Sequence, residues 1–389
     1  MGVKVLRYTG AAATAPLSGS WPMEQLLPWF ELKDTPGIGN HLFKRLIERF
    51  ETPDRVFEAP AKEITGVEGM SNRLASVIKK HRRSDTAKRE IEETFKRGFG
   101  IITQKDPAYP PLLLEIPDPP PFLYAYGRLE PIVSKIAVVG SRNATPYGIT
   151  MAKRLSVNLA AMGVTIVSGM ALGIDTAAHK GALAGGQKTV AVLGSGLGRI
   201  YPARNRNLFH RIAENGAVVS EFPLFTEPEP HHFPIRNRII SGMSLGTVVV
   251  EASRRSGSLI TARLAAEQNR EVFALPGSVQ SFKSTGTHTL IKQGAKLVEH
   301  AGDVLEEFSH LMALKKTAEG KNQQQVHSAL KLSEKESNVV KAIGPYPCHI
   351  DDLVRSLDME PGKLSGLLLQ LELKGVVQQL PGKQFVLKS

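Results

Sequence analysis

The sequence predicts an α/β protein built on an extended Rossmann-like sheet that is doubly wound and mostly parallel. Over residues 135–300, short β-branched runs alternate with glycine-rich turns and with segments of helical periodicity. The first three units share one layout: a β-branched run, then glycines, then residues suited to starting a helix. Sheets of this kind bind anionic ligands at their carboxyl edge, where strand ends meet helix N-termini.

The overall composition favours a polyanionic partner. Lysine and arginine number 49 against 37 acidic residues, a net charge of +12. A basic housekeeping enzyme would have the same balance, so charge alone leaves that class open. The single cysteine, Cys348, excludes an internal disulfide and a thiolate metal cluster, and it fits a reducing cytoplasm. No apolar run approaches the roughly 18 to 20 residues that cross a bilayer.

The chain is too long for one core, because single cores rarely grow past roughly 250 to 300 residues. Residues 1–22 lack the apolar centre of a secretory signal, so Met23 is a candidate functional start. A proline-dense passage and a polar, glutamine-rich passage mark two connections. The predicted division is a disordered leader (1–22), a helical domain (23–100), an extended connector packed on the next domain (101–134), a Rossmann-like domain (135–308), a flexible linker (309–332) and a winged-helix-like domain (333–389).

The predicted helical domain is of the helix-hairpin-helix or SAM-like type. A turn containing Gly37 and Gly39 precedes an amphipathic segment, and residues 66–83 look like a degenerate second copy, 29 residues on from Gly37. The second copy ends in a basic run that includes Lys79 and Lys80. Such glycines let the backbone approach a phosphate, so these four residues are accessory candidates for contacting DNA. A helical domain that only packs or binds protein has the same pattern.

The central domain offers strand candidates separated by helical patterns, which implies right-handed crossovers and a parallel sheet. They are residues 135–140, 164–169, 188–194, 217–221, 246–252, 271–277 and 295–298.

The C-terminal segment predicts three helices and a β-hairpin, the order of a winged helix. Ser333 and Glu336 form a candidate capping box for the first helix. The third helix begins near Pro361 and carries acids as well as lysines, so it is a poor phosphate binder. A protein-contact or accessory role is therefore favoured over base reading.

The glycine-rich turns match no nucleotide-binding signature. No GxxxxGK[ST] motif is present, and GSGLG at 194–198 lacks the GxGxxG spacing, so no cofactor is expected. Backbone N–H groups, serine hydroxyls and Arg142 at the strand ends would instead bind phosphates without sequence preference. The candidates in these turns are Gly140, Ser141, Arg142, Ser168, Gly169, Gly173, Gly194 and Gly196.

The stretch FPIRNRIISG at 233–242 supplies a second group of candidates. Arg236 and Arg238 flank Asn237 and predict a basic clamp beside Phe233, whose ring would stack on a base or belong to the core. Tyr201 and Asn205 leave the same two alternatives open.

Two other groupings of titratable residues are candidates for chemistry. Asp175 and His179 stand four apart, a spacing that suits an acid/base pair but more often a structural one. His231 and His232 are adjacent and no carboxylate stands at ligand spacing, so no metal is expected.

These motifs, taken in order, resemble the DprA/Smf family, the DNA processing protein A of natural transformation. The resemblance spans the whole central domain. It is carried by GSRxxTxYG (140–148), SGMALGIDTAAHKGAL (168–183), TVAVLGSGL (189–197), SEFP (220–223), FPIRNRIISGMS (233–244), EASRRSGSLITARLAAEQNREVFALPG (251–277) and GTHTLIKQGAKLV (286–298).

The resemblance implies a homodimer that binds single-stranded DNA through its Rossmann-like domain and helps load the RecA recombinase, with dimer and RecA surfaces toward 271–300. It places Arg142 on a phosphate, and lines the pocket with the backbone of Ser168, Gly169 and Gly173. Arg236, Asn237 and Arg238 would close it beside Phe233. Members often have a lysine near the Tyr-Pro turn; here Arg204 stands nearby as a candidate substitute.

An enzyme of related fold is the competing hypothesis. The sheet also resembles the lysine-decarboxylase-like nucleotide phosphoribohydrolases, which carry PGGxGT followed closely by acids. This chain keeps Gly246 and Thr247 but lacks the PGG, and Glu251 stands four residues beyond the threonine. The reading favoured is a non-enzymatic binder of single strands.

Overall fold

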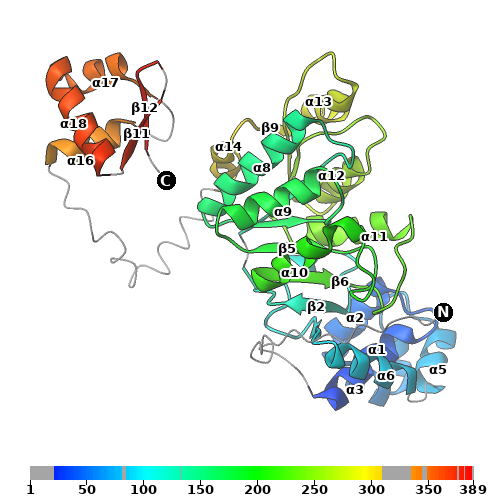
Figure 1. Cartoon of the computed structure of the whole chain (residues 1–389). Coiled ribbons are helices and arrows are strands. Elements are labelled where there is room, and N and C mark those ends of the chain that lie inside the picture. The colour runs from blue at the N-terminus through cyan, green and yellow to red at the C-terminus, as the bar shows by residue number, and fades with distance from the viewer. Residues whose placement is uncertain are drawn as a thin grey trace, which may run out of the picture. The chain divides into compact units, whose positions relative to one another are not determined.

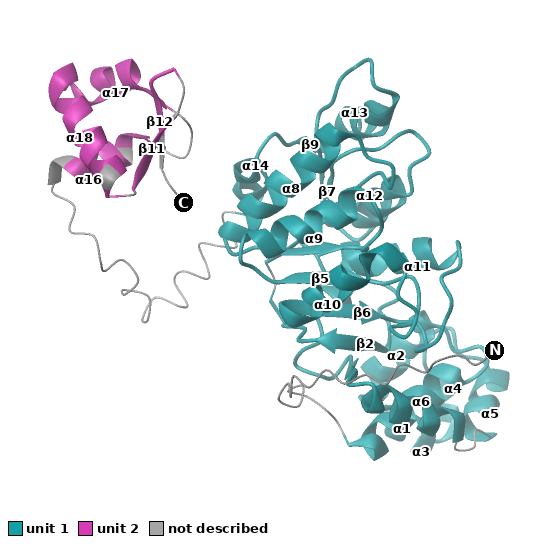
Figure 2. Ribbon diagram, viewed as in Figure 1, with its two compact units in different colours: residues 1–309 teal, residues 310–389 magenta. Residues whose placement is uncertain are grey.

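A computed structural model describes residues 22–80, 85–132, 134–308, 334–343, 348–374, 376–380 and 382–387. The chain divides into two compact units, residues 1–309 and 310–389, which are described separately (Figure 2). The predicted linker and the predicted leader up to residue 21 lie outside the described residues. None of the described helices is long and apolar enough to cross a membrane.

A nine-stranded mixed sheet forms the centre of the first unit, in the order β1-β2-β6-β5-β4-β3-β7-β8-β9 (Figure 1). The pairs from β6 to β9 are parallel, while β2 pairs antiparallel with both β6 and β1. Each strand predicted between 135 and 298 is present, which confirms the fold class. The strands are β1 (Gly100–Thr103), β2 (Phe122–Gly127), β3 (Lys135–Val139), β4 (Thr165–Ser168), β5 (Thr189–Val192), β6 (Gly216–Ser220), β7 (Gly246–Val249), β8 (Glu271–Ala274) and β9 (Lys296–Leu297).

The central strands read as continuous apolar runs because both faces of the sheet are covered. Val218 belongs to one hydrophobic cluster, and its neighbours Ala217 and Val219 belong to another. The first cluster includes α10 (Arg206–Glu214) and the N-terminal helices; the second includes α7 (Pro111–Glu115), α11 (His232–Gly242) and α12 (Ser258–Glu267). The remaining helical elements here are α8 (Pro146–Ala161), α9 (Ile174–Ala184), η1 (Ala203–Asn205), η2 (Phe282–Ser284), α13 (Thr285–Lys292) and α14 (Ala301–Glu307).

The segment predicted as an extended connector contributes regular structure to this sheet. β2 lies within it and pairs with β6, with Tyr124 opposite Ser220. The short helix α7 has Pro111 at its first position, where the backbone N–H that proline lacks would have no partner in the helix. The expected packing of this passage on the next domain is seen in β2, whereas α7 departs from the extended chain that was predicted, and the sheet begins at Gly100 rather than at residue 135.

Two hairpins in the N-terminal helices pack against each other. Gly37 and Gly69 both have left-handed backbones, with φ of 87° and 86°. An added Cβ at Gly37 would lie 2.6 Å from a methyl of Leu74, and one at Gly69 would lie 3.0 Å from a methyl of Leu42. The repeat predicted from Gly66 is therefore centred on Gly69. The helices are α1 (Met23–Asp34), α2 (Asn40–Phe50), α3 (Pro53–Glu58), α4 (Ala61–Thr65), α5 (Asn72–Lys80) and α6 (Asp85–Lys96).

The second unit has the predicted order of three helices and a hairpin. Its sheet has the order β10-β12-β11, and its core includes Leu353, Leu364 and Leu368. Of the predicted capping box, Ser333 lies outside the described residues, and the Glu336 carboxylate accepts hydrogen bonds from Lys374 Nζ at 2.6 and 2.8 Å. The elements are α16 (Glu334–Ile343), β10 (Cys348–His349), α17 (Ile350–Leu357), α18 (Pro361–Leu373), β11 (Val377–Leu380) and β12 (Gln384–Leu387).

Candidate nucleic-acid interface

Three glycine-rich turns meet at the carboxyl edge of neighbouring strands. They follow β3, β4 and β5 and contain residues 140–142, 169–173 and 194–198. The first two turns interlock, because the Ile174 N–H donates to Ser141 O at 3.2 Å. Gly173 has φ of 77°, and an added Cβ there would lie 2.3 Å from Ser141 O. The structure thus gathers Gly140, Ser141, Arg142, Gly169, Gly173 and Gly194 at one edge, as predicted.

An exposed aromatic and cationic surface lies on these turns, and we call Phe233, Arg142, Tyr201 and Gly194 the Phe233 platform. Arg142 Cζ lies 4.7 Å from the centroid of the Phe233 ring, and the Tyr201 ring lies 5.9 Å from it. An added Cβ at Gly194 would lie 2.8 Å from the Phe233 ring, so glycine is what allows the ring to rest on this turn. Tyr201 is 47% exposed and Phe233 is partly exposed, which suits stacking better than core packing.

Arg236 lies beneath this platform rather than at its surface. It is 3% exposed, and its Nη1 donates to Gly169 O at 2.8 Å and to Val192 O. Burial lowers the pKa of Arg236 to about 10, and the nearby Asp175 opposes that shift. The side chain remains charged at neutral pH and joins the ends of β4 and β5. Its positive charge lies 5.8 Å from the centroid of the Phe233 ring.

Arg238 does not join Arg236, so the predicted clamp does not form. Arg238 forms ion pairs with Glu221 and, at 3.2 Å, with Asp118. Residues two apart on a helix point to nearly opposite sides, and both arginines lie within α11. The Glu221 carboxylate also accepts a hydrogen bond from Asn40 Nδ2 at 3.4 Å, and this bond links α2 to the sheet.

The other predicted residues divide into buried and open positions. Ser168 is buried and its Oγ donates to Val138 O at 2.7 Å, so its hydroxyl serves the sheet. Gly196 is packed against the backbone of Pro223 and Leu224. Asn237 is partly buried beside Arg236, whose Nε donates to it at 3.3 Å. Arg204 is exposed on η1, which follows the turn that carries Tyr201.

Glu251 stabilises this edge of the sheet through hydrogen bonds. Its carboxylate accepts hydrogen bonds from Thr145 N at 3.1 Å and Thr145 Oγ1 at 2.5 Å, and its carbonyl accepts from Ser141 N at 2.8 Å. Thr145 Oγ1 in turn accepts from Gly148 N at the start of α8. Glu251 therefore holds the Arg142 turn and the helix start together, and its oxygens are engaged rather than aimed at a substrate.

Asp175 and His179 form hydrogen bonds with different partners inside the fold. Asp175 Oδ2 accepts from Ala171 N at 3.3 Å, and burial raises the pKa of its carboxyl. His179 is fully buried, and its Nδ1 lies 2.8 Å from Thr189 Oγ1. Burial lowers the pKa of His179 to about 3, so the ring is neutral at physiological pH. These contacts agree with the structural alternative.

Two cations at this edge were missed as candidates. Arg254 and Arg255 are exposed in the loop between β7 and α12, and β7 is the parallel neighbour of β3. The signal available in the sequence was an arginine pair shortly after a β-branched run. Strand order was needed to place that pair beside the Arg142 turn.

The expectation that no carboxylate stands at ligand spacing from the two histidines was wrong. Donor atoms of Glu229, His231 and His232 all lie within 4.8 Å of one another, a geometry that could hold a metal ion. His231 and Glu229 are both exposed and form an ion pair at 3.4 Å. The absence of a bound metal stays a prediction.

Two of the accessory candidates, Gly37 and Lys79, contact other residues of the helical domain. Gly37 lies against Leu74, and Lys79 Nζ donates to Phe57 O at 2.5 Å and Ala59 O at 3.1 Å, at the end of α3. Gly39 has open space where a Cβ would be, and Lys80 is exposed. Gly39 and Lys80 are therefore the accessory candidates that remain open to a phosphate.

Known proteins resemble the chain over nearly its whole length. Residues 100–309 match the DNA recombination-mediator protein A family, and residues 323–383 match the DprA winged helix domain. Protein Smf of Synechocystis is 34% identical over 92% of this chain and 97% of its own length. The crystal structure of DNA processing protein A from Streptococcus pneumoniae aligns with a TM-score of 0.63 at 37% identity, covering 72% of this chain and 97% of that one. A DNA processing protein A from Helicobacter pylori, whose structure concerns its single-stranded DNA binding mode, aligns with a TM-score of 0.50 at 30% identity, covering 55% and 96%.

Proposed function

Because this chain belongs to the DNA recombination-mediator protein A family, we propose that it binds single-stranded DNA at the Phe233 platform. A base stacks on the Phe233 ring, and Arg142 contacts a neighbouring phosphate. The bound strand is held for recombination, and no covalent bond is made or broken at the site.

The observation that carries this proposal is the arginine over an exposed ring at the carboxyl edge of a parallel sheet. Base stacking on aromatic rings tolerates any sequence, and cations along the groove neutralise the backbone. Arg236 adds a fixed charge below the ring, and Arg254 and Arg255 extend the cationic edge toward β7. The solved relative from Helicobacter pylori, which binds single-stranded DNA, supports the same ligand.

The family also supports a finer proposal for the partners. The protein acts in the cytoplasm as a homodimer through the Rossmann-like domain, and it passes its single strand to the RecA recombinase during transformation. Sedimentation at several concentrations tests the dimer. A binding titration of oligo-dT with and without RecA tests the transfer. The fraction of the strand bound by RecA must increase when this protein is present.

The proposed ligand is tested by fluorescence anisotropy with oligo-dT and with a duplex of equal length. Tight binding of the single strand and much weaker binding of the duplex are expected, because paired bases cannot stack on Phe233. Phe233→Leu, which keeps apolar volume but removes the ring, should reduce single-strand affinity. Equal affinities for the two DNA forms would overturn the proposal.

A further inference from the structure

A second aromatic ring lies on the same glycine-rich loop as Phe233. An added Cβ at Gly198 would lie 3.0 Å from the Phe225 ring, much as one at Gly194 would lie 2.8 Å from the Phe233 ring. Phe225 is 45% exposed, so nearly half of its surface is open to a ligand. The loop thus supports an exposed ring, Phe225, and a partly exposed ring, Phe233, each resting on one of its glycines.

Arginines accompany the second ring as they do the first. Arg97 Cζ, from the residue after α6, lies 4.9 Å from the centroid of the Phe225 ring, and Arg199 Cζ lies 5.9 Å from it. The corresponding distances from Phe233 are 4.7 Å for Arg142 and 5.8 Å for Arg236. Arg199 is two residues from Tyr201 of the Phe233 platform, so one loop connects both surfaces.

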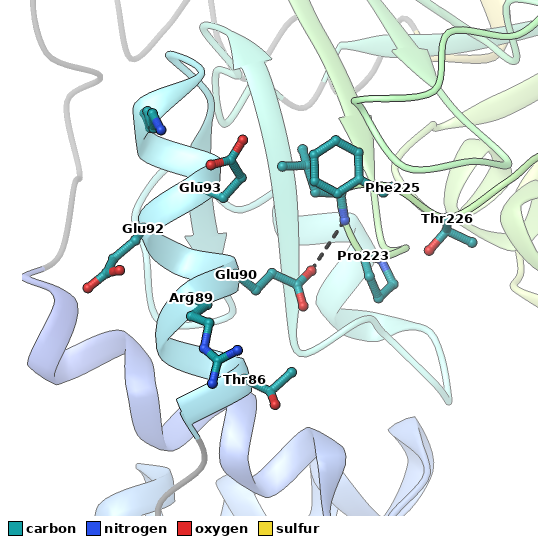
Figure 3. Close-up of a pocket in the computed structure, with 10 residues that line it drawn as sticks. Thr86, Arg89, Glu90, Glu92, Glu93, Pro223, Phe225 and Thr226 are labelled. Atoms are coloured by element: carbon teal, nitrogen blue, oxygen red, sulfur yellow. Dashed lines mark hydrogen bonds between the residues drawn. The ribbon is translucent and has the colours of Figure 1, made fainter.

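The ring of Phe225 borders a cavity of about 800 Å³ between α6 and residues 223–226 (Figure 3). Arg89 and Lys96 contribute positive charge to its lining. The cavity is open to solvent along one side. A flexible strand has room to enter it.

The acidic residues of this cavity are engaged within the protein or turned away. Glu90 accepts a hydrogen bond from Leu224 N at 3.2 Å (Figure 3), and it also accepts one from Tyr124 Oη at 2.5 Å. Glu93 pairs with Arg97 at 2.7 Å. Glu92 points away from the Phe225 loop (Figure 3). Glu90 therefore joins α6 to the loop, while the ring of Phe225 stays 45% exposed.

We propose that Phe225, with Arg97 and Arg199, is a second stacking site that takes a base of the same single strand after it leaves the Phe233 platform. Gly194 and Gly198 are four residues apart, so their Cα atoms are separated by at most about 14 Å at 3.3 to 3.6 Å per residue. A few nucleotides bridge that span. The inference rests on the proposed function, since it extends the strand bound at the first platform.

The test measures affinity against oligonucleotide length. The full chain and its Phe225→Leu and Phe225→Ala variants are titrated with oligo-dT of about 5 and about 16 nucleotides, near the limits of common single-strand site sizes. Met162→Ala is the matched control, because Met162 is 55% exposed at the far end of α8, away from the carboxyl edge. Thermal unfolding of each variant verifies that the fold is kept.

The expected result is a selective loss. Both Phe225 variants bind the longer oligomer roughly 5- to 150-fold more weakly, the value of one stacked base, and bind the shorter one as the parent does. Phe225→Trp restores the affinity, and its fluorescence is quenched only by the longer oligomer. Unchanged binding of the longer oligomer by Phe225→Leu overturns the inference, as does equal loss on both lengths or an equal loss in Met162→Ala. A parent chain that binds neither oligomer refutes the proposed function itself.

Discussion

Replacing Arg142 by alanine should weaken DNA binding and leave the free energy of unfolding nearly unchanged. Arg142 is exposed, and its guanidinium contacts the Phe233 ring, an interaction worth about 0.5 to 1 kcal/mol at an exposed site. The free energy of unfolding should therefore change by about 1 kcal/mol or less. A charge-assisted contact with a phosphate is worth about 1.5 to 3 kcal/mol, so the affinity for oligo-dT should fall roughly ten- to 150-fold.

The salt dependence gives a second readout of the same variant. Each phosphate neutralised on a single strand contributes about −0.7 to the slope of log K against log[salt], so Arg142→Ala should flatten the slope by about 0.7. Anisotropy titrations between about 50 and 200 mM salt measure this slope. Arg211→Ala is the control, because Arg211 is exposed in the last turn of α10, away from the carboxyl edge. Equal losses of affinity and slope in the two variants would refute a local role for Arg142.

Three further predictions concern the scaffold. Thr145→Ala removes the α8 cap and a donor to buried Glu251, and should lower the free energy of unfolding by about 1 to 3 kcal/mol in a urea titration; no loss would mean that the cap is not needed. Because the folded pKa of His179, about 3, lies below the ordinary 6.5, its neutral form contributes stability that is complete above pH 6.5 and is lost as pH falls toward 3. His179→Gln should therefore flatten the pH dependence of unfolding by up to about 1.4 kcal/mol per pH unit in that window, and an unchanged profile would contradict the assignment. Glu221→Gln should cost up to about 3 to 5 kcal/mol, because buried Arg238 keeps only its ion pair with Asp118, whereas the double variant with Arg238→Met should recover much of that loss; additive losses would show that the two side chains do not interact.

The parallel sheet was predictable because its signal is local. A β-branched run followed by glycines reports a buried strand and the turn after it, and parallel strands present those turns at one edge. The cluster of Arg142 with Gly169, Gly173 and Gly194 follows from that rule. β1 and β2 were not predictable in this way, because both pair antiparallel, β2 finds its second partner β6 far along the chain, and the neighbouring prolines indicate an extended loop.

The side chains of α11 show where sequence reasoning stops. Arg236 and Arg238 look alike in the sequence, but a helix directs them to opposite sides, one to Gly169 and one to Glu221. The partners are set by tertiary packing and leave no local mark. The same is true of Phe225, whose position on Gly198 and beside Arg97 depends on the packing of α6 against residues 223–226.

The most direct measurement is a crystal structure of the chain bound to a short thymidine oligomer. We predict a thymine ring stacked on Phe233 and a phosphate oxygen within hydrogen-bonding distance of the Arg142 guanidinium. An oligomer bound elsewhere, with the turns after β3, β4 and β5 empty, would contradict the proposed site.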